Sequence, residues 1–292
     1  VPAYWFKDVG MLGHFAVTDL QNKKFQADAI HNFLFNKSKA DDKKYDLMID
    51  TWTAREENGK HILHAQMKGY EIARAAGLSV RFICTFTNKS VKHREVIFNF
   101  FKDQGFVLKL HPALPSLRSE NPKEWALEPE EYGDLLVYLL DKSLENFGKM
   151  EVMNINDLCR CVFTRRGSVC TFVNCMGNTF AIGPDGSIYP CYRFVGMPEW
   201  VMGNVRDKPT MEQLMRSDPG RRMTAFSEYV DTACKDCSHL RYCRGGCPYN
   251  AIAPSGGSLD GVDPHCVAYK RIFDELNDRL NKEMFDEPMP GF

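Results

Sequence analysis

After position 60, apolar residues recur at helix and strand spacings in alternation. One helical face is marked by small or apolar residues three or four positions apart: Ile62, Ala65, Gly69, Ile72, Ala73 and Ala76. Gly77 then predicts the end of that helix. Two β-branched or aromatic runs, Val80–Phe86 and Val107–His111, predict strands, and the helix between them has an apolar face of Val96, Ile97, Phe100 and Phe101. We also expect a helix over about Pro129–Phe147 and a short strand over Glu151–Asn154.

This alternation favours parallel βαβ units and an α/β fold class. Only about three units are visible, fewer than an eight-unit barrel requires, so the first half predicts either part of a barrel or an open sheet. Before residue 60 the pattern is weaker. There we expect a strand at His14–Leu20, a helix at Phe25–Phe35 and a polar loop at Asn36–Lys44.

Charge and hydropathy exclude several classes of partner. The net charge of −1 gives no long-range field that would attract nucleic acid or an anionic membrane. No apolar run approaches the roughly 20 residues that cross a bilayer. We therefore expect no nucleic acid, no membrane and a cytoplasmic location. The first residues have neither Met nor the form of a signal peptide, so we expect a fragment or a processed chain.

The cysteines are concentrated in the second half of the chain. Of the 11, all but Cys84 lie between Cys159 and Cys266, where glycine and turn residues are also frequent. We therefore expect a domain boundary near residues 148–156. A disulfide framework is typical of small secreted domains without a large core, which this chain does not resemble. The close C-x2-C and C-x3-C spacings favour metal ligation instead.

Turn residues predict a β-hairpin between two of these cysteines. The run Gly183–Gly186 (GPDG) is strong turn chemistry between two short alternating segments. A hairpin here would bring together its ends, which carry Cys175 and Cys191. Local geometry alone would then direct two thiols at one site.

Counting the cysteines leaves two kinds of metal site open. The ligands suggested by spacing number seven: Cys175, Cys191, Cys234, Cys237, Cys243, Cys247 and Cys266. Two four-thiolate sites need one more, for which Cys170 is the nearest candidate, with Cys159 and Cys161 as spare ligands or free thiols. Zinc and [4Fe–4S] clusters accept the same four-cysteine ligand set, so spacing does not decide between them.

The complete pattern resembles a known domain. The spacing C-x10-G-x4-C, C-x2-C-x5-C-x3-C, C closely resembles the seven-cysteine SPASM domain of radical SAM enzymes, supported by the runs GPDGSIYPC, GNV and CRGGCP. The resemblance covers about residues 170–280, and residues 59–147 resemble later units of the radical SAM partial barrel. It implies a partial (β/α) barrel over 1–150, a SPASM domain over 151–285 with a β-hairpin and C-terminal helix, and a tail over 286–292.

The resemblance also implies a function. It suggests a maturase that modifies a peptide or protein under anaerobic conditions, with two auxiliary [4Fe–4S] clusters and a low-potential donor such as ferredoxin or flavodoxin. S-adenosylmethionine and a third [4Fe–4S] cluster are expected only with a missing N-terminal part. The alternative is a non-catalytic iron–sulfur module for electron transfer or peptide binding.

The sequence departs from that family in two places. The C-x3-C-x2-C motif of the S-adenosylmethionine site is absent, because Asn250 stands where Cys243-x3-Cys247 would be completed. Sulfatase-maturating members carry an Asp, a candidate base, directly after the second cysteine of the hairpin, where this sequence has Tyr192. A phenol with a pKa near 10 is a poor base at neutral pH. We therefore favour another peptide or protein substrate over a sulfatase. Tyr192 is the single catalytic candidate, with packing beside a cluster as its alternative role.

The resemblance further implies that the cysteine sets are crossed along the chain. The expected sets are Cys170, Cys175, Cys191 and Cys247, and Cys234, Cys237, Cys243 and Cys266. Gly245 and Gly246 allow the backbone to reverse between Cys243 and Cys247. Cys266 would begin an amphipathic helix, whose N-terminus stabilises a thiolate.

Overall fold

The computed structural model describes residues 3–5, 12–14, 46–50, 67, 69–115, 123–252 and 261–286. The expected helix at Phe25–Phe35 and loop at Asn36–Lys44 lie outside these residues, as do most of the strand expected at His14–Leu20 and of the 286–292 tail. The chain forms two compact units. Unit 1 comprises residues 1–85, 95–111 and 148–151, and unit 2 comprises 86–94, 112–147 and 152–292.

Unit 1 contains the α/β part of the fold. Its three-stranded sheet has the order β3 (Asp46–Asp50), β4 (Ser79–Phe86) and β5 (Leu108–Pro112). Strands β3 and β4 are parallel, with Asp46 opposite Ser79, and a helix over residues 69–75 precedes β4. The short strands β1 (Ala3–Trp5) and β2 (Leu12–His14) pair antiparallel. The predicted α/β class is therefore confirmed.

The helix α3 (Arg94–Asp103) buries only part of the face that was predicted. Phe101 is buried and Ile97 and Phe100 are partly buried, as expected, whereas Val96 is 69% exposed and Phe98 is buried in addition. The orientation is set by aromatic packing against the sheet, because the ring of Phe101 meets that of Phe82 edge-on at 6.4 Å. That contact links distant residues, and spacing within the helix does not reveal it.

A second prediction is wrong at the end of unit 1. The segment Glu151–Asn154 is not a strand, because α5 begins at Met153 and runs to Thr164. Its buried residues, Ile155, Leu158, Cys161 and Val162, recur at helical spacing. Arg165 ends the helix in the left-handed conformation with a φ of 52°.

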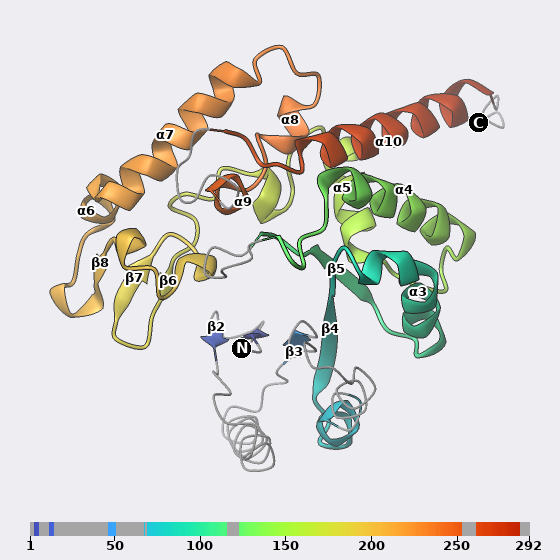
Figure 1. Cartoon of the computed structure of the whole chain (residues 1–292), viewed down its shortest axis with the longest axis horizontal. Helices are drawn as coiled ribbons and strands as arrows, with labels where there is room; N and C mark the ends of the chain where they lie inside the picture. The colour runs from blue at the N-terminus through green and yellow to red at the C-terminus, as the bar shows by residue number, and fades with distance from the viewer. Residues whose placement is uncertain are drawn as a thin grey trace, which may run out of the picture. The chain divides into compact units, whose positions relative to one another are not determined.

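Two long helices pack together in unit 2. Helix α4 (Pro129–Glu145) lies along α10 (Cys266–Asp286), as Figure 1 shows. Their buried apolar residues include Leu135, Leu136 and Leu139 on α4 and Tyr269, Ile272, Phe273 and Leu276 on α10. Gly133 permits close approach, since a Cβ there would lie 3.3 Å from the Cα of Ala268. Both predicted helices are confirmed, including the start of α10 at Cys266.

The predicted hairpin is also present in unit 2. Strands β6 (Ala181–Ile182) and β7 (Ser187–Tyr189) are antiparallel, and β8 (Gly203–Asn204) adds a third strand beside β7. In the turn, the carboxylate of Asp185 accepts hydrogen bonds from the Ser187 backbone N–H (3.1 Å) and hydroxyl (2.7 Å). Gly186 has a φ of 85°, which favours glycine.

The remaining helices of unit 2 lie between β8 and α10 along the chain. Helix α6 (Met211–Arg216) begins with a capping box of Thr210 and Gln213, and α7 (Asp218–Ala233) follows it. Short helices α8 (Leu240–Cys243) and α9 (Pro248–Ile252) lie before α10. The 3-10 turns are η3 (Ser90–His93), η4 (Cys170–Phe172), η5 (Tyr192–Phe194), η6 (Pro198–Trp200) and η7 (Val205–Asp207).

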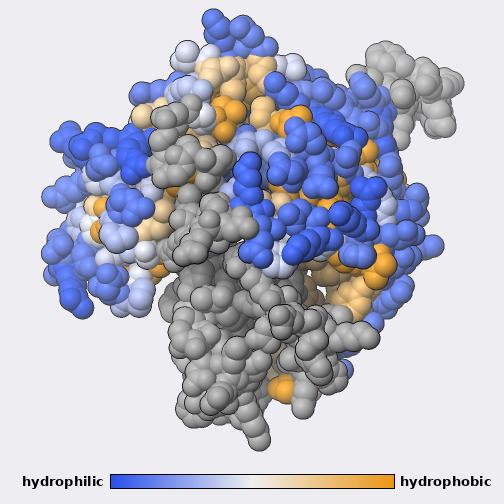
Figure 2. All heavy atoms as spheres, in the orientation of Figure 1, coloured by the Kyte–Doolittle hydropathy of each residue, from blue (hydrophilic) through white to orange (hydrophobic). Residues whose placement is uncertain are grey.

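The visible surface is polar over most of the described residues. Figure 2 shows hydrophilic residues over much of this face, with apolar residues in separate small groups. Within the described ranges, no helix combines the length and apolar character needed to cross a membrane.

Candidate metal centre

The cysteines expected to bind metal all lie in unit 2, most of them at or next to the ends of its elements. Cys170 begins η4, Cys234 caps the C-terminus of α7 and Cys243 ends α8. Cys247 immediately precedes α9, and Cys266 begins α10. No disulfide joins the ten cysteines between Cys159 and Cys266, so none competes for these thiols.

The first group of thiols is recognised by mutual electrostatic interactions. Burial raises the pKa of Cys175 to about 11, and the nearby Cys247 and Cys170 contribute to the shift. Burial likewise raises the pKa of Cys191 to about 12, with Cys247 and Cys170 again contributing. The pKa of Cys247 is raised by burial and by its proximity to Cys170, although Arg193 opposes the shift. These four thiols therefore lie near one another.

A second group is defined in the same way. Burial raises the pKa of Cys243 to about 12, and Cys266 and Cys234 contribute to the shift. The pKa of Cys234 is raised by burial and then by Cys266 and Cys237. Burial also raises the pKa of Cys266, with Cys237 adding to it. The second group thus comprises Cys234, Cys237, Cys243 and Cys266.

The structure places the spare cysteines together on α5. Burial raises the pKa of Cys159, and the neighbouring Cys161 adds to it. The sulfur of Cys161 is buried and lies 3.2 Å from the Oγ of Ser168. Cys170, by contrast, interacts with Cys175 and Cys191. The identity of the eighth ligand stays a prediction, for which Cys170 has the supporting contacts.

Two kinds of site accept four thiolates. A tetrahedral zinc with bonds of about 2.3 Å would hold its sulfurs about 3.8 Å apart. A [4Fe–4S] cluster takes one thiolate per iron and spreads the four sulfurs further. Within the described ranges, the structure shows no three Cys, His, Asp or Glu side chains arranged to hold one metal ion.

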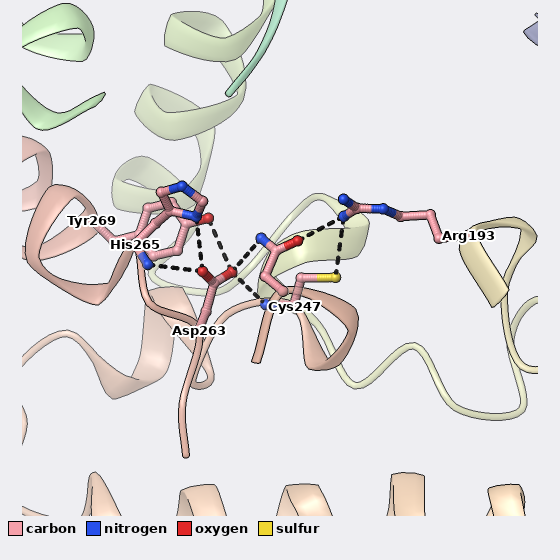
Figure 3. Close-up of polar contacts among 6 residues, drawn as sticks. Arg193, Cys247, Asp263, His265 and Tyr269 are labelled. Carbon is pink, nitrogen blue, oxygen red and sulfur yellow. Dashed lines mark hydrogen bonds and ion pairs between the residues drawn. The ribbon is translucent and has the colours of Figure 1, made fainter. Parts of the chain in front are cut away.

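A buried carboxylate, Asp263, contacts Cys247 of the first group (Figure 3). Asp263 is 0% exposed. Its Oδ2 accepts hydrogen bonds from the Cys247 backbone N–H (2.9 Å), the Asn250 side-chain amide (2.7 Å) and the Tyr269 hydroxyl (3.2 Å). Its Oδ1 accepts one from the His265 backbone N–H (2.9 Å) and lies 3.0 Å from the ring Nδ1 of His265. The charge is thus solvated by protein groups in place of water.

Two consecutive glycines make room for this carboxylate. Gly245 and Gly246 have φ values of 78° and 80°. A Cβ on Gly246 would lie 2.2 Å from the Cβ of Asp263, and one on Gly245 would lie 2.3 Å from Cγ2 of Val230. The backbone N–H of Asp263 also donates to the Gly245 carbonyl at 3.0 Å. The reversal expected at these glycines is therefore present, and it brings Cys247 to Asp263.

Arg193 approaches Cys247 of the first group from the side opposite Asp263 (Figure 3). The Nη1 of Arg193 donates to the side-chain oxygen of Asn250 at 2.7 Å and lies 4.0 Å from the sulfur of Cys247. Its guanidinium lies over the ring of Tyr249, 4.1 Å from the centroid. Figure 3 shows Cys247 between Arg193 and Asp263.

The side chain of Tyr192 is packed against the protein core. It packs against a core of Phe194, Trp200 and neighbouring residues. Burial raises the pKa of Tyr192 to about 12, although the Arg193 charge opposes the shift. The side chain is therefore a neutral phenol near neutral pH and is unsuited to act as a base.

Sequence analysis did not find Asp263, Asn250 and Arg193 as site residues. Asn250 is visible only as the residue that interrupts a cysteine motif, and neither charged residue has a spacing signal. His265 is a hydrogen-bonded buried histidine at 2% exposure.

Comparison with known proteins identifies the cysteine-rich part. Residues 170–238 match the SPASM family, an iron–sulfur cluster-binding domain. An uncharacterised protein of Methanothermobacter thermautotrophicus is 56% identical over 111 residues, covering 38% of this chain and 42% of that protein. A cysteine-type anaerobic sulfatase-maturating enzyme of Clostridium perfringens is 26% identical over 221 residues, covering 72% of this chain and 59% of the enzyme.

Solved structures show a related fold. The structure of native anSMEcpe with bound AdoMet superimposes with a TM-score of 0.60 at 22% identity, covering 74% of this chain and 60% of that one. The chain spans only 42% and 59% of the lengths of the two relatives described above. The resemblance found in the sequence is confirmed: this chain carries a SPASM iron–sulfur cluster-binding domain and is similar to the anaerobic sulfatase-maturating enzymes of the radical SAM/SPASM class.

Proposed function

We propose that this chain is the SPASM-bearing part of a radical SAM maturase that modifies a peptide or protein. The observation that carries the proposal is the match of residues 170–238 to the SPASM iron–sulfur domain, and the electrostatic influence of the thiols on one another supports two sets of four. Each set would hold one auxiliary [4Fe–4S] cluster, with Cys247 crossing to the first set and Cys266 to the second. The coarser assignment to an iron–sulfur domain rests on the family match.

The residues of this chain would hold and insulate those clusters. When bound, the clusters supply one-electron acceptors or an anchoring iron for the substrate. The cysteines provide thiolates, and the Gly245–Gly246 reversal and buried Asp263 fix the position of Cys247. We place S-adenosylmethionine and a third cluster outside these 292 residues, because the C-x3-C-x2-C motif does not occur in them. A ferredoxin or flavodoxin would supply the electrons.

The substrate class follows partly from the relatives and partly from Tyr192. A related solved structure contains native anSMEcpe with AdoMet and the Cp18Cys peptide, which supports a peptide or protein substrate here. Tyr192 follows the second hairpin cysteine, where sulfatase-maturating members carry an Asp, and it is neutral near pH 7. We therefore propose a modification other than sulfatase maturation.

The test compares the product of the complete gene with this chain alone. Given S-adenosylmethionine and dithionite, the complete product should release 5′-deoxyadenosine, and the 292-residue chain should release none. A mass change in a co-expressed peptide would identify the substrate. A complete gene product that retains iron and sulfide but never cleaves S-adenosylmethionine would support the non-catalytic module instead.

A further inference from the structure

Arg193 and Asp263 are fixed charges placed unequally with respect to the two cysteine sets. Arg193 lies beside the first set, since its Nη1 is 4.0 Å from the sulfur of Cys247. The guanidinium cannot turn away freely, because Asn250 accepts its hydrogen bond at 2.7 Å and Tyr249 lies against its face.

Asp263 acts on both sets. It accepts the Cys247 backbone N–H, and through the His265 N–H it holds the residue that precedes Cys266. The carboxylate thus lies beside ligands of both sets. A fixed carboxylate opposes further negative charge on either set, whereas the guanidinium of Arg193 offsets it beside Cys247.

The cation near the second set, Lys270, is more exposed to solvent than Arg193. Lys270 lies one turn after Cys266 on α10, and its side chain is exposed. Water and salt screen an exposed charge strongly, whereas a clamped and partly buried guanidinium is screened much less. The charge of Arg193 beside the first set is therefore the less screened of these two.

We propose that Arg193 makes the cluster held by Cys170, Cys175, Cys191 and Cys247 the more easily reduced of the two. This inference rests on the proposed function, because it assumes that both clusters are bound. Reduction adds one electron and one negative charge to a cluster, with no proton or bond change. A fixed cation beside a ligand sulfur stabilises the reduced form and raises its potential.

The test is a redox titration of the anaerobically prepared chain, followed by electron paramagnetic resonance with dithionite as the one-electron reductant. Arg193→Gln should lower the higher of the two reduction potentials by at least about 59 mV. At a fixed applied potential, this shift lowers the ratio of reduced to oxidised cluster tenfold. The same variant should shift the lower potential less. Arg193→Lys keeps the charge and should restore most of the shift. The control Lys270→Gln, which removes the exposed cation, should move neither potential by as much. Cys237→Ser, which alters only the second set, identifies the signal of that cluster.

The iron and sulfide content distinguishes a failure of the proposed function from a failure of this inference. A wild-type chain without two clusters contradicts the proposed function and, with it, this inference. A chain with two clusters contradicts the inference alone if Arg193→Gln leaves both potentials unchanged or shifts them equally. Loss of iron in both Arg193→Gln and Arg193→Lys would also overturn it, because the arginine would then be needed for assembly and not for its charge.

Discussion

Gly246→Ala would place a methyl group in the space that Asp263 occupies. The new Cβ would lie 2.2 Å from the Cβ of Asp263 and 2.7 Å from its Oδ2. Asp263 is fully buried and is held by hydrogen bonds on both oxygens, so it has no free volume into which to move. The alanine would also have to adopt a φ near 80°.

The expected destabilisation by Gly246→Ala is the sum of two separate free-energy costs. An L-residue in the left-handed region costs about 1–2 kcal/mol. Overlap with a fixed neighbour adds about 1–3 kcal/mol. Gly177→Ala is a matched control in unit 2, because Gly177 has a φ of 81° and its nearest neighbour, the Sδ of Met215, would lie 3.9 Å from the Cβ. The difference between the two variants isolates the overlap, which corresponds to about a 5- to 160-fold change in an opening equilibrium.

Amide hydrogen exchange measures that difference locally. The N–H groups of His265 and Tyr269 lie in or beside the Asp263 network, so the peptide spanning residues 261–276 reports its opening. We expect this peptide to exchange faster in Gly246→Ala than in Gly177→Ala by the factor above. Equal exchange in the two variants would show that Asp263 is not fixed beneath Gly246 and would refute the reasoning.

Five further variants test other parts of the structure. Cys247→Ser should remove one cluster, about four irons, whereas Cys161→Ser should leave the iron content unchanged, because Cys161 is paired with Ser168. Leu139→Ala on α4 should lower the free energy of unfolding by about 2–5 kcal/mol, since Leu139 is 0% exposed. Arg279→Leu removes a partly exposed ion pair to α4 at 2.7 Å and should cost less than about 1 kcal/mol in the same chemical denaturation. Tyr192→Phe should retain both clusters and, in the complete gene product, 5′-deoxyadenosine release within about tenfold of wild type, because a neutral phenol is unsuited to accept a proton as a base. A larger loss would assign Tyr192 a chemical role.

Elements with strong local signals were predicted from the sequence. The strand β4, the helix α10 and the turn at Gly183–Gly186 each depend on residues close together in the chain. Helix α7 was not predicted, although Met223, Phe226 and Val230 recur at helical spacing behind the N-cap Ser217. The density of cysteines after it drew attention from that pattern.

Features that depend on residues far apart in the chain could not be predicted from local sequence patterns. The two-residue strand β8 exists because β7 pairs with it, and so short a segment carries no pattern of its own. The contact of Arg193 with Cys247 joins residues 54 positions apart. Cysteine spacing locates the ligands because each tight turn fixes its own thiols, whereas the charges around them are positioned by tertiary packing.

The metal content of the purified chain tests whether these cysteines hold two clusters. The 292-residue chain, prepared and reconstituted without oxygen, should be brown and contain about eight irons and eight acid-labile sulfides per chain. Iron, sulfide and zinc are measured on the same sample. Stoichiometric zinc without sulfide would contradict the account, because the thiols would then be structural zinc ligands with no redox function.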